Sequence, residues 1–291
     1  MKLYYYIHTG HRVGLDRLRR SAPVINALKA MGVDVTMLTS DFRAGEYAKE
    51  QFGIDKYVSV DVVRNIANIA TPQDGLVFDS EEESRRLWED MADYFSLFVR
   101  ISDDPDDFMT EESGLVSSMK EGSGIIKADI VDPRYFEKSV HDGGMVYFWG
   151  DDDYEMQLLP FARVFEGLDV TLLEGYYFFM QYGNELSRCF NRVEESETYD
   201  ETLMRAERFI TSSPQSALEA LAAGSNPIYL MKPGAATAWQ RKMEALGIPT
   251  IGSFSKNEIS QKISEAFVYN DKLLQNDAAS EVAMYIKDKL S

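Results

Sequence analysis

The chain has 291 residues, of which 45% are apolar and 27% are charged, and its net charge is −18. This length accommodates two domains of ordinary size, and the composition is typical of a soluble globular protein. The strong negative charge argues against general nucleic-acid binding, which needs a basic surface. A single cysteine, Cys189, excludes an internal disulfide framework and a cysteine-based zinc site.

Two absent signals bear on location. No apolar run approaches the ~20 residues that a membrane-spanning helix needs. The first residues, MKLYYYIHTG, have no long apolar segment followed by a small-residue cleavage site, so they do not read as a signal peptide. We therefore expect a cytoplasmic protein without a membrane span.

The start of the chain predicts a β–loop–α–β unit. An aromatic and apolar strand is expected over Lys2–Ile7, a loop over His8–Leu15, a helix that ends at Gly32, and a second strand over Val33–Leu38. This order opens a doubly wound α/β domain, whose ligands bind at the carboxyl ends of the strands. The loop lacks a G-x-G-x-x-G fingerprint, so the sequence does not support a dinucleotide enzyme, and we expect no cofactor.

A basic cluster follows the first strand of this acidic chain. Four arginines and two of the three histidines fall within thirteen residues: His8, His11, Arg12, Arg17, Arg19 and Arg20. An anionic ligand requires such a local positive exception. A solvated helix face is the alternative, but the position of the cluster at the mouth of a strand–helix loop favours a site.

Polar residues follow the next predicted strands. Gly75–Phe78 ends in Asp79-Ser80, and Phe95–Ile101 ends in Ser102-Asp103-Asp104. Aspartates also cap helices and begin turns, so these positions have an ordinary structural interpretation as well. The stretch Asp106–Asp129 is predicted as loops that lead to one short strand. We expect a linker within 132–144 and hence domains over 1–137 and 138–275, with a C-terminal helix over 276–291 that packs on the first domain.

The second domain is predicted to begin with the strand Met145–Trp149. Gly150 and three aspartates follow, and the Asp-x-Asp spacing of Asp151 and Asp153 admits a divalent metal. The same aspartates equally suit the start of a helix over Tyr154–Phe165, because negative charge favours a helix N-terminus. The aromatic run within 175–184 is expected to be core.

The most informative stretch runs from Phe209 to Gly252. It predicts a strand, a hydroxyl-rich turn, a helix that Ser213 caps, Pro214 opens and Gly224 ends, a second strand and a second helix. A helix N-terminus preceded by serines offers free N–H groups and a positive dipole end to an anion, usually a phosphate. Glu219 lies close to this turn.

The pattern S-S-x-x-S-x-x-E-A-L, followed by a small apolar strand and then by Gln240, resembles the nucleotide-binding region of GT-B glycosyltransferases. Within that superfamily it is most similar to the UDP-sugar hydrolase of pseudaminic acid biosynthesis. The resemblance implies two Rossmann-like α/β domains that face one cleft, with UDP bound by the second. It places the phosphates near three serines and the ribose near a glutamate, and the implied nucleotide-binding set is Gly14, Gly150, Ser212, Ser213, Ser216, Glu219 and Gln240.

The chain departs from that family at the family's histidine. Where the family has I-G-x-G-H with the presumed catalytic base, this chain has Val13-Gly14-Leu15-Asp16-Arg17. Arginine stays protonated near neutral pH and cannot act as a general base, but it can bind a phosphate or carboxylate. We therefore predict that Arg17 binds an anion, and that hydrolysis by the family's route is slow or absent.

The leading function is glycosyl transfer from a nucleotide-sugar, a UDP-sugar, to an unknown acceptor in surface glycan or nonulosonic acid metabolism. Arg17 would neutralise the leaving diphosphate, and the base would be His11, His8 or Asp16. One alternative is hydrolysis of a UDP-sugar with His11 in the role of the lost histidine. Another is a nucleotide-sugar-binding protein without catalysis. We expect no divalent metal, since GT-B sites use helix dipoles and basic side chains.

Overall fold

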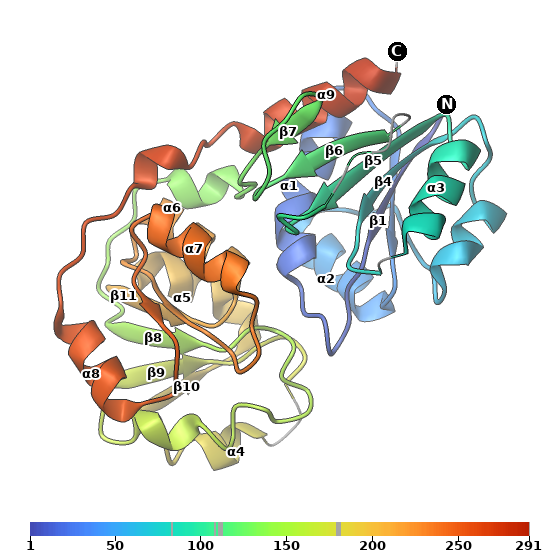
Figure 1. The fold of residues 1–291 in the computed structure, drawn as a ribbon. Helices are drawn as coiled ribbons and strands as arrows, with labels where there is room; N and C mark the ends of the chain where they lie inside the picture. Colours follow the sequence, from blue (N-terminus) through green and yellow to red (C-terminus); the bar gives the residue numbers. More distant parts are fainter. Residues whose placement is uncertain (83, 108, 110–112, 179–181, 291) are drawn as a thin grey trace. The chain divides into compact units, whose positions relative to one another are not determined.

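The chain forms two compact units in a computed structural model that describes residues 1–82, 84–107, 109, 113–178 and 182–290 (Figure 1). The first unit comprises Met1–Gly10, Arg17–Pro133 and Gln275–Ser291. The second comprises His11–Asp16 and Arg134–Leu274. In the described part of the chain, no helix is both long and apolar enough to cross a membrane.

The first unit is built on a seven-stranded sheet in the order β3-β2-β1-β4-β5-β6-β7. All neighbouring strands are parallel, and β1, β2 and β4 are buried along their whole length. The first six strands follow the order 3-2-1-4-5-6 that is typical of dinucleotide-binding folds. The strands are β1 (Leu3–Ile7), β2 (Val35–Thr39), β3 (Tyr57–Ser59), β4 (Gly75–Asp79), β5 (Leu97–Ser102), β6 (Ser113–Ser117) and β7 (Ile125–Lys127).

Strand β6 corrects the sequence-based expectation of loops before the last strand of this domain. Its five residues, SGLVS, are all buried, and it pairs with β5 and β7. Serine and glycine at three of the five positions hide the strand from hydrophobic periodicity, because tertiary burial rather than side-chain type makes it a strand. Residues 108 and 110–112 of the same predicted loop lie outside the described residues.

The helices of the first unit have capping residues that the sequence displays. Asp41 accepts a hydrogen bond from the N–H of Arg43, and Gly53, at φ 65°, ends that helix. Ser84 caps the helix that follows β4. An aromatic cluster around Tyr6, Phe78 and Phe98 forms one core layer. The elements are α1 (Asp16–Ala30), α2 (Phe42–Phe52), η1 (Val63–Asn68), α3 (Arg85–Tyr94) and α9 (Ala278–Leu290).

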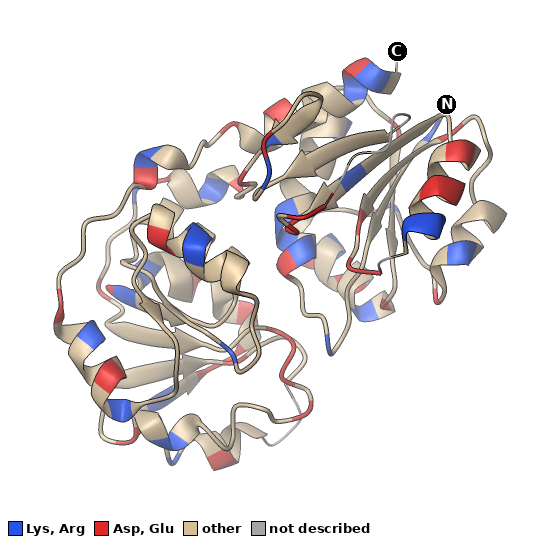
Figure 2. Ribbon diagram, in the orientation of Figure 1, with Lys and Arg blue, Asp and Glu red and all other residues tan. Residues whose placement is uncertain are grey.

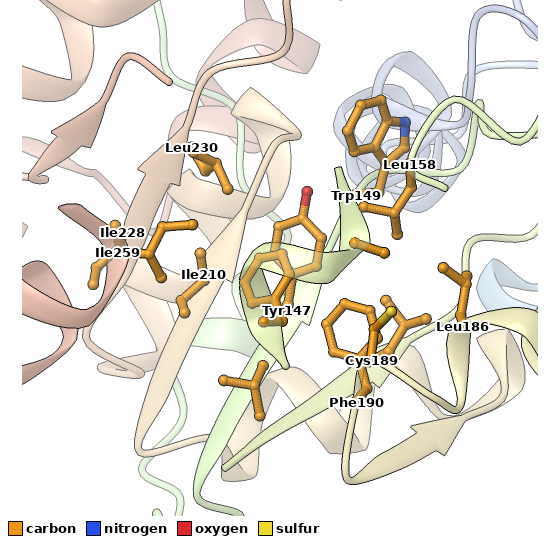
Figure 3. Packing of buried hydrophobic residues seen from close by; sticks show 14 of the residues in the cluster. Tyr147, Trp149, Leu158, Leu186, Cys189, Phe190, Ile210, Ile228, Leu230 and Ile259 are labelled. Atoms are coloured by element: carbon orange, nitrogen blue, oxygen red, sulfur yellow. The ribbon is translucent and has the colours of Figure 1, made fainter. Parts of the chain in front are cut away.

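The second unit has a six-stranded parallel sheet in the order β10-β9-β8-β11-β12-β13, which repeats the 3-2-1-4-5-6 arrangement. Figure 3 shows its core, in which Tyr147, Phe190 and Ile210 pack together with Leu186 and Leu230. The strands are β8 (Met145–Phe148), β9 (Val170–Leu173), β10 (Arg192–Glu194), β11 (Arg208–Thr211), β12 (Ile228–Leu230) and β13 (Thr250–Ile251).

One predicted helix of this unit is absent. Residues 154–165 form turns and a short 3-10 helix, because Pro160 lacks an N–H donor and Met156 takes a left-handed φ of 57°. Residues 179–181 of the aromatic run are outside the described part. The helical elements are η2 (Pro133–Phe136), η3 (Ala162–Phe165), α4 (Tyr182–Leu186), η4 (Ser196–Thr198), α5 (Tyr199–Arg205), α6 (Pro214–Ala223), α7 (Thr237–Ala245), α8 (Lys256–Ser264) and η5 (Asp271–Leu273).

Candidate functional site

A cavity of about 340 Å³ lies in the second unit, next to the carboxyl ends of β8, β11 and β12. The chain order reverses between β8 and β11, which is where doubly wound folds bind ligands. The residues after these three strands supply most of the wall. The lining residues are Val13, Gly14, Asp16, Gly150, Asp151, Asp152, Ser212, Ser213, Pro214, Tyr229, Lys232, Pro233, Gly234, Ala235, Ala236 and Trp239.

The serine turn between β11 and α6 is held rigidly. Ser213 Oγ accepts a hydrogen bond from the N–H of Ser216 at 3.0 Å, and its own N–H donates to Thr211 Oγ1 at 3.0 Å. Ser212 Oγ lies 3.0 Å from the Tyr147 hydroxyl. The predicted cap, the proline at the first helical position and the glycine end of α6 are confirmed, with Gly224 at φ 78°. The start of α6 is therefore fixed against the wall of the cavity.

Asp16 places a carboxylate at this helix N-terminus. Ser213 Oγ lies 2.8 and 2.9 Å from the two oxygens of Asp16, to which it can donate its single proton. A negative charge is favourable at the positive end of a helix dipole. The chain's own carboxylate therefore occupies part of the position that a ligand anion would favour.

Lys232 is the cation of the cavity wall, and sequence reasoning missed it. Its Nζ lies 2.5 Å from Asp152 Oδ1 and 5.0 Å from the centre of the Trp149 ring, and about a fifth of its side chain is exposed. Gly150, at φ 126°, makes room for this pair, since a Cβ there would stand 2.7 Å from Asp152 Oδ1. The available signal was a lone lysine two residues after a buried strand.

The first turn of α7 also meets the cavity. Ala236 stands at its N-cap and makes no side-chain hydrogen bond to the helix. Ala235, Ala236 and Trp239 all line the cavity. An N-terminus without a capping side chain leaves backbone N–H groups for water or a ligand. Trp239 adds a partly exposed aromatic surface beside them.

Two of the predicted nucleotide-binding residues, Ser216 and Glu219, do not line this cavity. Both are fully buried. The Tyr199 hydroxyl lies 2.7 Å from Ser216 Oγ and 2.6 Å from Glu219 Oε2, and Gln215 Nε2 donates to Glu219 Oε1 at 3.1 Å. A ribose hydroxyl would have to displace one of these bonds to reach the carboxylate.

Of the other predicted site residues, Gly14 lines the cavity, whereas His11 and Gln240 do not. Gly14, at φ 80°, lines the cavity. The His11 ring packs against Tyr154, with 5.2 Å between ring centres, and neither residue lines the cavity. Gln240 Nε2 donates to Glu244 Oε1 at 3.0 Å, one turn along α7.

The two aspartates considered as metal ligands accept backbone hydrogen bonds. Asp151 Oδ1 accepts from Tyr176 N–H at 3.0 Å, and Asp153 Oδ1 accepts from Gln157 N–H at 2.5 Å. Burial raises the pKa of Asp153 to about 6. Within the described ranges, no group of three or more histidine, cysteine or acidic side chains is arranged to hold a metal ion.

Three arginines of the basic cluster, Arg12, Arg17 and Arg20, pair with carboxylates. The buried Arg20 forms ion pairs with Asp79, at 2.8 Å from its Nε, and with Asp103. Arg17 Nη2 lies 3.0 Å from Glu81, so the predicted anion-binding arginine is paired within its own unit. In the second unit Arg12 pairs with Glu155. Figure 2 shows the same interleaving of basic and acidic residues along the helices.

No family model and no curated protein matches the chain. Solved structures do. UDP-GlcNAc 2-epimerase of Methanocaldococcus jannaschii, in complex with UDP-GlcNAc and UDP, is 9% identical, and the match covers 99% of this chain and 100% of that one with a TM-score of 0.64.

Two further solved structures are similar. MnaA of S. aureus, in a co-structure with UDP, is 9% identical over 100% of this chain and 97% of its own, with a TM-score of 0.67. The spinosyn rhamnosyltransferase SpnG, complexed with thymidine diphosphate, is 10% identical over 100% and 96%, with a TM-score of 0.56. The α/β fold with two parallel Rossmann-like sheets is therefore the GT-B fold, as the sequence predicted.

Proposed function

We propose that the second unit binds the diphosphate of a UDP-linked sugar and that the protein acts on the glycosyl bond of that ligand. One observation carries the proposal: the serine turn of α6, the uncapped start of α7 and Lys232 all border one cavity at the topological switch point. The uncapped N–H groups at the start of α7, the serine hydroxyls before α6 and one ammonium group suit a diphosphate. The similar solved structures hold UDP or thymidine diphosphate.

Binding involves an exchange of partners. Lys232 is paired with Asp152, and Ser213 with Asp16, so a diphosphate takes over the lysine and the hydroxyl and leaves two carboxylates to water. Both carboxylates border the cavity, and their repulsion lowers the affinity for a highly charged ligand. Trp239 supplies an aromatic surface for a sugar or base ring.

The reaction that we propose is transfer of the glycosyl group to an acceptor hydroxyl. The bond between the anomeric carbon and the diphosphate oxygen breaks, the acceptor oxygen bonds to that carbon, and a base takes the acceptor proton. Asp16, His8 and His11 remain the base candidates. Burial lowers the pKa of His8, which keeps its imidazole neutral and able to accept a proton near neutral pH. Epimerisation is the second candidate, because epimerases recur among the similar structures.

The experiment is titration of the protein with UDP, thymidine diphosphate and UDP-GlcNAc, with binding measured by calorimetry and by tryptophan fluorescence. Trp239 lines the cavity and Trp149 lies beneath Lys232 Nζ at 5.0 Å, so ligand binding should change the signals of these two tryptophans and leave that of Trp88, in the first unit, unchanged. We expect Lys232→Ala to weaken UDP binding by roughly ten- to a hundredfold, the loss of one charged hydrogen bond. Lys262→Ala is the matched control, because Lys262 pairs with Glu265 in the same unit, away from the cavity.

Turnover then separates the reactions. Release of UDP only with an added acceptor indicates transfer, release without an acceptor indicates hydrolysis, and a changed sugar without UDP release indicates epimerisation. Saturable binding without turnover indicates a binding protein. Failure of all three nucleotides to bind the folded wild-type protein, or an equal loss in Lys232→Ala and Lys262→Ala, contradicts the proposed site.

A further inference from the structure

A second recess lies in the first unit, between η1 and α3. Its volume is about 470 Å³, and it is separate from the cavity described above. The Tyr94 hydroxyl lies within hydrogen-bonding distance of two backbone carbonyls, those of Ala67 at 3.3 Å and Ala70 at 3.2 Å, which joins the two elements at one end. The residues that line it are Arg64, Ala67, Arg86, Leu87, Asp90, Met91 and Tyr94.

The rim carries two arginines, Arg64 and Arg86, for which the described part of the chain supplies no ion pair. Within the described residues, neither Arg64 nor Arg86 forms a salt bridge or a hydrogen bond, although the chain has 48 acidic residues and only 30 basic ones. The neighbouring Arg85 behaves differently, because its Nε lies 2.8 Å from Glu89. With Asp90 counted, the recess has a formal charge of +1.

The floor is apolar. Met91 is buried, and Leu87 packs against the aromatic core cluster of this unit. Two large apolar side chains on or beside η1, Val62 and Ile69, remain 54% and 37% exposed. A recess lined by two arginines and by apolar side chains matches a ligand with a planar anionic head and an apolar body.

We infer that this recess is a binding site for a small organic monocarboxylate with an apolar body. One negative charge on the ligand balances the net charge of the rim, whereas a phosphate dianion or a diphosphate would exceed it and meet Asp90. The two arginines bind the carboxylate oxygens, and the aliphatic or aromatic body covers Leu87 and Met91. This inference concerns a different unit from the proposed nucleotide site and does not rest on it.

The test uses three probes on the full chain: phenylacetate, acetate and benzyl alcohol, with binding measured by calorimetry and by ligand-observed NMR. Phenylacetate should bind saturably, and acetate, which lacks the apolar body, and benzyl alcohol, which lacks the charge, should each bind at least about tenfold more weakly. The double variant Arg64→Ala/Arg86→Ala should reduce phenylacetate affinity at least about tenfold.

Two controls locate the effect. Arg85→Ala removes an arginine from the same helical turn that is already paired, and Lys232→Ala alters the other cavity; both should leave phenylacetate affinity unchanged. The three arginines are exposed, so the variants should fold, which circular dichroism checks. Absence of saturable phenylacetate binding, equal affinity for acetate, or an equal loss in Arg85→Ala would each overturn the inference.

Discussion

The topological switch points of the two sheets can be compared directly, since both sheets have the strand order 3-2-1-4-5-6. Between β1 and β4, charged side chains neutralise one another: Arg20 is buried against Asp79 and Asp103, and Arg17 pairs with Glu81. Between β8 and β11, the residues after the strands line a cavity instead, and its wall contains glycines, serine hydroxyls, Trp239, three aspartates and one lysine that pairs with Asp152.

This difference shows that a concentration of charge in the sequence is a poor measure of charge available to a ligand. The basic cluster after the first strand was interpreted as a site for an anion, yet Arg17 and Arg20 pair with carboxylates from positions 79, 81 and 103. Lys232, alone in its stretch, borders the cavity instead. If this interpretation holds, the charged residues at the switch point of the first sheet stabilise the fold, and those at the switch point of the second sheet bind ligand.

The largest expected effect is on stability. Asp79→Ala leaves Arg20 buried beside Asp103 alone, and removal of one partner of a buried ion pair costs about 3–5 kcal/mol. We expect a loss of that size in the free energy of unfolding, measured by hydrogen exchange of the β1 and β4 amides. Glu89→Ala removes a partner from the exposed Arg85 pair and should cost under ~1 kcal/mol. Similar losses in the two variants would show that the buried ion pairs of Arg20 do not stabilise the first unit.

The second effect is a pH dependence in the second unit. Asp153 has a pKa of about 6 in the folded chain against an ordinary 3.8, so the folded state holds more protons between these values. Stability therefore falls as pH rises from about 4 to about 6, by up to about 3 kcal/mol. Asp153→Asn keeps an acceptor for the Gln157 N–H and should flatten this part of the denaturation-midpoint profile. Parallel profiles for wild type and variant would contradict the assignment.

The third effect is on UDP affinity, and it compares Lys232 of the second unit with Arg17 of the first. Lys232→Ala should weaken UDP binding by about 1.5–3 kcal/mol, whereas Arg17→Ala should weaken it less, because Lys232 lines the cavity and Arg17, which pairs with Glu81, does not. Isothermal titration of both variants checks the ranking. An equal or larger loss for Arg17→Ala would support the sequence-based hypothesis that this arginine binds the ligand's anion.

The smallest expected effect concerns Asp16. Asp16→Asn removes a negative charge from the wall while it keeps a hydrogen-bond acceptor for Ser213, so UDP affinity should rise by about 1 kcal/mol, roughly fivefold. Ser216→Ala, which removes a buried hydroxyl from the first turn of α6 and changes no charge, is the comparison variant. If turnover also disappears in Asp16→Asn while affinity rises, Asp16 is the base. Unchanged or weaker UDP binding would exclude competition between Asp16 and the phosphates.

Local signals in the sequence were sufficient for most of the fold. Alternating strands and helices, the caps Ser213 and Gly224 and the long buried strands predicted an α/β protein, because caps and periodicity act within a few residues. The GT-B arrangement was implied by the resemblance of the serine motif to that superfamily. Strand β6 was not predicted from the sequence. Its serines and glycine have no strand preference of their own, and only burial between β5 and β7 makes them a strand.

The candidate site shows the same distinction between local sequence signals and tertiary contacts. The sequence by itself determined the serine turn, its capped helix and the glycines that flank it, all of which depend on local backbone chemistry. Tertiary structure alone decided which charges remain available: it buried Glu219 under Tyr199, paired Arg17 with Glu81, and brought Lys232 beside Asp152 at the cavity. Charge pairing acts through space between residues that are distant in the chain, so the local sequence of a strand and its helix does not predict it.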